Sequence, residues 1–184
     1  MAESIGRVQQ GYRRILLNSL SPTRPYYEKG ADLSREDFVA GKLEALSRWQ
    51  YEKDGRQPHF DVKFYKLPLS YALDFYTYQR VVEVKCRENP HDQYRTFFIA
   101  LRKWRDGLVL AKALGTQGRF VIAVGYTDGI YTLTVDPVAP PLVYVQWGGR
   151  SDRNDQGDAE PMVHIENRLF VKQSSDSPWE QGYE

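Results

Sequence analysis

Two neighbouring apolar segments that contain charged residues constrain this chain most. Residues 71–78 and 80–87 are rich in β-branched and aromatic side chains and partly alternate, which predicts two adjoining β-strands. Asp74 lies in the first segment, and Glu83 and Lys85 lie in the second. Because successive strand residues point to opposite faces, Glu83 and Lys85 share one face. Burial of these charges is costly unless another group compensates them, and a divalent metal compensates two carboxylates.

The composition is that of an ordinary globular protein and excludes several other classes. With 184 residues and a net charge of +1, the chain is expected to form a single domain over 1–184, and nucleic-acid binding would have to come from local basic clusters. The one cysteine, Cys86, excludes a disulfide within the chain and a zinc site built from cysteines. No apolar run approaches the roughly 20 residues of a membrane span, and the first ten residues lack the apolar core of a secretory signal. We therefore expect no membrane association and a cytoplasmic location.

Helical periodicity is found in three parts of the chain. An amphipathic pattern predicts an N-terminal helix over 4–19. A second helix is predicted from the N-cap Ser34 to about Tyr51, and the longest from residue 93 to residue 114. The five basic residues of the longest helix are Arg95, Arg102, Lys103, Arg105 and Lys112.

The second predicted helix offers two glutamates that could reach the charged strands. At about 100° per residue, Glu36 lies about 20° from Leu43, at the edge of the apolar stripe. Glu44 lies about 160° from Leu46, on the side expected to face solvent. This geometry favours Glu36, although a glutamate in a first helical turn also stabilises the helix through its dipole.

The segment after the longest helix reads as a hairpin. Residues 119–126 and 130–136 flank Asp128-Gly129, a strong turn signal. Residues 120–124 are apolar on both faces, which is typical of a central strand that is covered on both sides.

The C-terminal part predicts a second β-hairpin, an extension over 142–172. Its strands are expected at 142–147 and 162–172, separated by a polar, glycine-containing loop. The tail from Gln173 onward is polar and is expected to be frayed.

The spacing of the charged strand residues resembles a known motif. Asp74, then eight residues, then Glu83-Val84-Lys85 is similar to the bipartite motif of the PD-(D/E)XK nuclease superfamily. The residue before the first acid is Leu73, where the motif has proline.

The resemblance extends to the order of the predicted elements. The helix that carries Glu36 is similar to the first core helix of the superfamily and its glutamate, and the likeness covers about residues 34–136. It implies an α/β (α+β) fold, in which helices flank a mixed central sheet with a restriction-endonuclease-like core. The hairpin at 142–172 would be an extension of this core.

The resemblance implies a metal-dependent nuclease that hydrolyses DNA. Asp74 and Glu83 would supply the hard oxygen ligands that Mg²⁺ prefers, with Mn²⁺ as a substitute, and the carbonyl of Val84 would add a third. Lys85 would orient the attacking water, help to deprotonate it, or stabilise the developing charge. Glu36 would complete the set of metal ligands or hold a metal-bound water.

Basic residues near the site are the predicted DNA contacts. They are Arg87, Arg95, Arg102 and Lys103. Phosphate contacts of this kind position a duplex without reading its sequence, and no base-reading element is recognised. A homodimer is expected by analogy with enzymes that cut two strands, while endo or exo action and the strandedness of the substrate stay open.

Two other readings compete with the nuclease. In one, the chain is a catalytically inactive nuclease-fold module that binds DNA or another partner. In the other, the lysine and the two acids form a structural salt bridge on the strand face.

Overall fold

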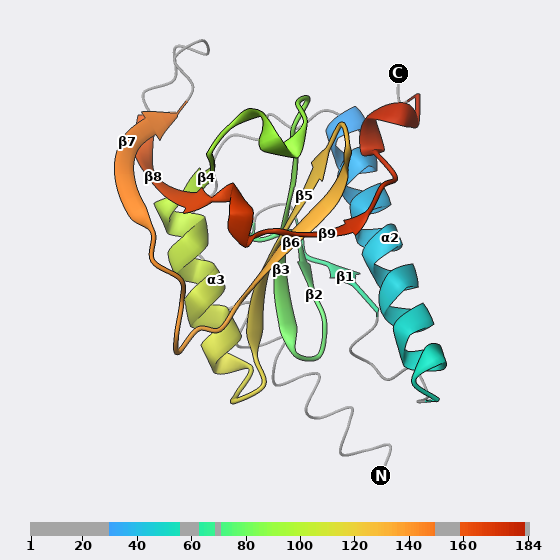
Figure 1. Ribbon diagram of the computed structural model, residues 1–184. Helices are drawn as coiled ribbons and strands as arrows, with labels where there is room; N and C mark the ends of the chain where they lie inside the picture. The colour runs from blue at the N-terminus through green and yellow to red at the C-terminus, as the bar shows by residue number, and fades with distance from the viewer. Residues whose placement is uncertain (1–29, 56–62, 69–70, 150–158, 183–184) are drawn as a thin grey trace.

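The described chain forms a six-stranded sheet that is covered by one helix on each face, with a smaller sheet beside it (Figure 1). The structure is a computed structural model that describes residues 30–55, 63–68, 71–149 and 159–182, so the helix predicted over 4–19 lies outside the described residues. The large sheet has the order β1-β2-β3-β5-β6-β9. Its strands are β1 (Tyr65–Lys66), β2 (Phe75–Tyr76), β3 (Arg80–Cys86), β5 (Arg119–Tyr126), β6 (Gly129–Val135) and β9 (Val171–Ser174).

The smaller sheet and the two long helices complete the core. The smaller sheet has the order β4-β8-β7, with β4 at Thr96–Ala100, β7 at Tyr144–Gly149 and β8 at Ala159–Glu166. The helices are α2 (Gly30–Lys53) and α3 (Leu101–Ala113). The described residues also contain three short 3₁₀ helices: η2 (His91–Gln93) and η3 (Asn167–Leu169) lie in connections, and η4 (Pro178–Glu180) follows the last strand.

The parallel pairing of β3 with β5 forms the centre of the large sheet. Val81 pairs with Phe120 and Glu83 with Ile122, whereas the other neighbouring strands of this sheet are antiparallel. The chain between β3 and β5 contains β4 and α3, which is the long crossover that a parallel pair requires. The predicted fold class, a mixed central sheet flanked by helices, is confirmed.

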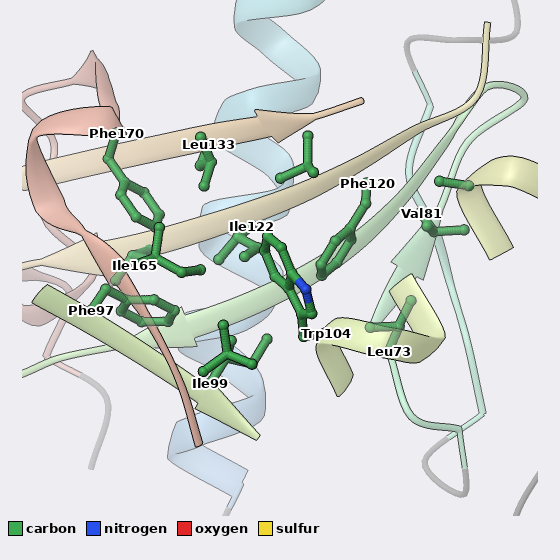
Figure 2. Close-up of a cluster of buried hydrophobic side chains, with 14 of the residues drawn as sticks. Leu73, Val81, Phe97, Ile99, Trp104, Phe120, Ile122, Leu133, Ile165 and Phe170 are labelled. Carbon is green, nitrogen blue, oxygen red and sulfur yellow. The ribbon is translucent and has the colours of Figure 1, made fainter. Parts of the chain in front are cut away.

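One face of this sheet packs against α3 and the smaller sheet. Phe120 is fully buried, and its ring meets the Trp104 ring edge-to-face, with 5.9 Å between the ring centroids. Ile122 lies beside them, and Phe97 and Ile165 extend the same cluster into the smaller sheet (Figure 2).

The opposite face is covered by α2. Val82, Val84 and Ala123 pack there under Val39 and Leu43 of the helix. Because β5 is buried on both faces, the prediction of a doubly covered strand at 120–124 is confirmed. The predicted hairpin of 119–126 with 130–136 is also confirmed, as β5 and β6.

The helix predicted over 93–114 is wrong for residues 93–100, because residues 96–100 form the strand β4. Phe97 and Ile99 are buried, whereas Phe98 between them is exposed, which is the alternation of a strand. The spacing of Phe97 from Leu101 and Trp104 matches a helical stripe only by coincidence. The helix begins at Leu101, so Arg95 precedes β4 and is not on α3.

The second predicted helix is longer than expected. It begins at Gly30, and Ser34 lies within it, where its hydroxyl donates a hydrogen bond to the Gly30 carbonyl at 3.0 Å. The prediction of Ser34 as the N-cap is therefore wrong.

The prediction of a C-terminal hairpin is correct for β7 and β8 but wrong beyond them. After β8 the chain returns to the large sheet as β9, which pairs with β6. The expected frayed tail is instead attached to the core: Ser177 is fully buried and its hydroxyl donates to the Tyr126 carbonyl at 3.0 Å. Pro178 packs so closely on Gly125 that a Cβ there would lie 2.6 Å from the proline ring.

We expect Gly107→Ala to destabilise the fold although alanine is the better helix former. A Cβ at Gly107 would lie 2.6 Å from the ring of Phe120, which is fully buried and packed against the Trp104 ring. The overpacking should lower the free energy of unfolding by about 1–3 kcal/mol in urea denaturation. Gly41→Ala is the matched control, since Gly41 is exposed in α2 with no atom within 4 Å of its added Cβ, and it should raise stability by about 0.5–1 kcal/mol. Equal effects at the two positions would contradict this packing.

Candidate active site

Asp74 is fixed at the edge of β3 by backbone and side-chain hydrogen bonds. Its N–H donates to the Val82 carbonyl at 3.1 Å, and its own carbonyl accepts the Leu67 N–H at 2.8 Å. Its carboxylate oxygen Oδ2 accepts the Val84 N–H at 2.7 Å. The strand pairing of β2 with β3 covers only Phe75 and Tyr76. Beyond it, the Asp74 carboxylate, and not a backbone carbonyl, accepts the hydrogen bond of the Val84 N–H.

The same hydrogen bond shows where the Val84 carbonyl points. The N–H and C=O of one strand residue point to the same side of the strand. Since the Val84 N–H reaches Asp74, the Val84 carbonyl also points to the Asp74 side and away from β5. This orientation is the one that the predicted metal role of Val84 requires.

Glu83 is a carboxylate that is completely buried in the sheet. Its oxygen Oε1 lies 2.9 Å from the Nζ of Lys85 and 2.5 Å from the Nζ of Lys103. Its second oxygen, Oε2, is also buried, and no hydrogen-bond partner contacts it among the residues that the structure describes. The competing structural interpretation of the sequence was a salt bridge of Lys85 with both acids, and of this arrangement the ion pair with Glu83 is present.

Burial and neighbouring charges set the protonation of this pair. Burial raises the pKa of the Glu83 carboxyl and Asp74 raises it further, whereas Lys103 and Lys85 lower it. Burial disfavours the charged form of Lys85, but Glu83, Asp74 and Glu36 outweigh this and raise the pKa of its ammonium above the usual range. Lys85 is therefore a protonated donor at neutral pH.

Lys103 belongs to this cluster, although the sequence suggested only a DNA contact. It is in the first turn of α3, which faces the strand that carries Glu83. The sequence alone could have placed Lys103 beside Glu83 only if the start of α3 at Leu101 had been known.

The two candidate glutamates of α2 occupy different surroundings. Glu36 is buried, and its charge contributes to the raised pKa of Lys85. Glu44 is half-buried; its Oε2 accepts the Phe64 N–H at 3.3 Å and its Oε1 contacts Arg48. The structure thus brings Glu36, and not Glu44, to the charged cluster.

A small cavity of about 40 Å³ lies over the site. Glu36, Asp74 and Lys103 line it, together with Lys66 and Tyr71 among others. A buried water needs roughly 10–15 Å³, so the cavity has room for more than one.

These residues fit a hydrated Mg²⁺ better than a cation bound by protein ligands alone. Within the described part of the chain, no three His, Cys, Asp or Glu side chains are grouped closely enough to hold a metal. Mg²⁺, however, keeps several waters and takes one or two carboxylates. Asp74 lines the cavity, and the buried Oε2 of Glu83 and the Val84 carbonyl would supply two further oxygens of such a partial set from β3.

The predicted DNA contacts Arg87, Arg95 and Arg102 come from three different parts of the chain around β3, β4 and α3. Arg87 follows β3, and its guanidinium lies over the rings of Phe97 and Phe98. Arg95 is exposed before β4, and Arg102 is half-buried in the first turn of α3.

Cys86 lies on the opposite face of β3 from Glu83, as the strand alternation predicted. Burial raises the pKa of its thiol to about 12, so the thiol stays protonated and is not a nucleophile at neutral pH.

Comparison with known proteins gives one family. A family model described as "Phage putative PDDEXK endonuclease" matches residues 22–173, which is most of the chain. No curated protein and no solved structure matches the chain significantly. In the described residues, no helix is long and apolar enough to cross a membrane.

We expect Lys103→Met to destabilise the protein more than Lys112→Met does. Methionine removes the closer of the two ammonium groups at Glu83 and leaves that buried carboxylate with Lys85 alone. The expected loss is about 2 kcal/mol in the free energy of unfolding, measured in urea. Lys112 is exposed in the last turn of the same helix and should change stability by less than about 0.5 kcal/mol. Equal losses would show that the Lys103 contact contributes nothing to stability.

Proposed function

Since the chain belongs to the phage PDDEXK endonuclease family, we propose that it hydrolyses DNA phosphodiester bonds with Mg²⁺ held by Asp74 and Glu83. Membership of this family supports nuclease activity of the PD-(D/E)XK kind, a class that generally uses divalent metals. We propose three further points: that the metal is Mg²⁺, that the substrate is DNA, and that the residues named here carry out the reaction.

The buried oxygen Oε2 of Glu83 supports the proposal most directly. A buried carboxylate oxygen without a hydrogen-bond partner is costly in a purely structural salt bridge. The cost is explained if this oxygen is kept for a cation. The Asp74 carboxylate and the Val84 carbonyl lie on the adjoining side of β3 and would complete the protein ligands.

A divalent cation at this site would supply positive charge against the scissile phosphate and lower the pKa of water. The protein contributes fixed positions, since the Val84 N–H holds the Asp74 carboxylate. Glu36 lines the cavity, where its carboxylate can accept a hydrogen bond from water and orient it.

Lys85 acts as a donor in this proposal. The neighbouring carboxylates of Glu83, Asp74 and Glu36 raise the pKa of its ammonium, which favours the protonated form in the metal-free site. It can donate a hydrogen bond to a phosphate oxygen and stabilise the negative charge that develops there. Of the roles that the sequence suggested for Lys85, the proposal uses charge stabilisation and orientation.

Lys103 has two roles in the same proposal. Its ammonium neutralises Glu83 at 2.5 Å, and it also lines the cavity. The positive charge is thus placed to meet a phosphate that enters the cavity. Phosphates on either side of the scissile phosphate would be contacted by Arg87, Arg95 and Arg102. Such contacts position a DNA strand without reading its sequence.

We expect Asp74→Asn to abolish Mg²⁺-dependent nicking of a supercoiled plasmid. Asparagine keeps an oxygen for the Val84 N–H but removes the charge that a cation requires. Glu83→Gln should behave in the same way, and each loss should be about 100-fold or more. If the native chain cleaves no duplex, single-stranded or branched DNA in Mg²⁺ or Mn²⁺, the catalytic proposal fails and the inactive binding module is favoured.

A matched pair of substitutions in α2 serves as the internal control for this assay. Glu36→Gln should lower the rate, because Glu36 lines the cavity with Asp74. Glu44→Gln should leave the rate near that of the native chain, because Glu44 contacts Phe64 and Arg48 instead. The reverse order would place the functional glutamate at Glu44.

A further inference from the structure

A row of planar side chains crosses the outer face of the smaller sheet. Phe98, His164 and Tyr144 are directly paired across β4, β8 and β7. The Tyr144 and His164 rings are stacked, with centroids 4.8 Å apart and planes 9° apart, and the Phe98 ring is 5.8 Å from the His164 ring. The guanidinium of Arg87 lies 5.1 Å from the Phe98 ring and forms the other end of the row.

This row is exposed and ends at a sheet edge. Tyr144 is 52% exposed and Phe98 is 43% exposed, whereas the neighbouring Phe97 and Val163 point inward and are buried. In the described residues β7 is the edge strand of its sheet, so the outer face of the Tyr144 ring has no strand beside it. A further planar group can therefore continue the stack beyond Tyr144.

The charges around the row favour an anionic partner over a second copy of this chain. Arg87 lies in the row, and Arg95 and Arg168 are exposed beside the start of β4 and the end of β8. The two acids of β8, Glu160 and Glu166, lie toward its ends, and Glu166 is paired with Arg168. The row thus has aromatic surface at its centre and a positive charge at its Arg87 end, and the nearest acid on its face along β8, Glu166, is neutralised by Arg168.

The row begins beside the candidate active site. Arg87 is two residues beyond Lys85, about 7 Å along an extended strand. From Phe98 to Tyr144 the row crosses two strand spacings, about 10 Å. A nucleic-acid strand with its scissile phosphate at Lys85 can reach this surface within a few nucleotides.

We propose that Arg87, Phe98, His164 and Tyr144 form a stacking surface for the unpaired bases of a single DNA strand near the cleavage site. Aromatic side chains accept any base because every base has a planar face, and paired bases inside a duplex do not present theirs. This inference rests on the proposed DNA substrate and adds its class: DNA that is single-stranded or unpaired on this side of the cut.

The test is binding of a labelled oligothymidylate and of a labelled blunt duplex, measured by fluorescence anisotropy in EDTA with the full chain. Tyr144→Ala should weaken binding of the single strand about tenfold, the effect of losing one stacked base, and should change duplex binding much less. Tyr144→Phe keeps the ring and should bind the single strand like the native chain. Tyr78→Ala is the matched control, since Tyr78 is 43% exposed in the turn between β2 and β3, away from the row.

Three results would overturn the stacking surface. They are native-like binding of the single strand by Tyr144→Ala, an equal loss on single strand and duplex, and a loss with Tyr78→Ala as large as with Tyr144→Ala. Sedimentation in which Tyr144→Ala only converts a dimer to a monomer would also overturn it, because the surface would then bind a second copy. Circular dichroism of each variant verifies folding, and Tyr144→Phe supplies the rescue.

The measurement is independent of catalysis, since EDTA removes the metal. If Asp74→Asn still cleaves while Tyr144→Ala loses the single strand, the proposed catalytic residues fail and the stacking surface stands. If Asp74→Asn is inactive and Tyr144→Ala binds normally, only the stacking surface fails.

Discussion

The buried carboxylate of Glu83 is the constraint on which the site depends. A charge at the centre of an apolar sheet requires partners, and two ammonium groups come from elements that the fold must bring together. Lys85 comes from the same strand face two residues later, and Lys103 comes from the first turn of α3. The position of Lys103 in turn requires β4 to end at Ala100, so that α3 begins against β3. One crossover therefore supplies both β4 of the smaller sheet and the Lys103 partner of Glu83.

Local patterns in the sequence were sufficient for the centre of the fold. Strand alternation placed Glu83 and Lys85 on one face, and helical geometry favoured Glu36 over Glu44; the described structure agrees with both. The apolar run at 120–124 predicted a strand that is covered on both faces. In these places the local preference and the tertiary packing agree.

The remaining features depend on contacts between residues far apart in the chain. Residues 96–100 have apolar side chains that fit a helical stripe or a buried strand, and only their pairing with β8 decides for the strand. The Lys103 contact with Glu83 could not be predicted for the same reason. Likewise Ser177 is polar in a polar tail, and its burial follows from a hydrogen bond to Tyr126, 51 residues away in sequence.

Whether Asp74 and Glu83 hold a cation is tested most directly by anomalous diffraction from a crystal soaked in Mn²⁺. The expected result is one anomalous peak in contact with the Asp74 carboxylate, the Oε2 oxygen of Glu83 and the Val84 carbonyl, and the loss of this peak in a crystal of Asp74→Asn. A native crystal without a peak there, in which Lys85 and Lys103 still pair with Glu83, would contradict the metal site and leave the cluster as a salt bridge.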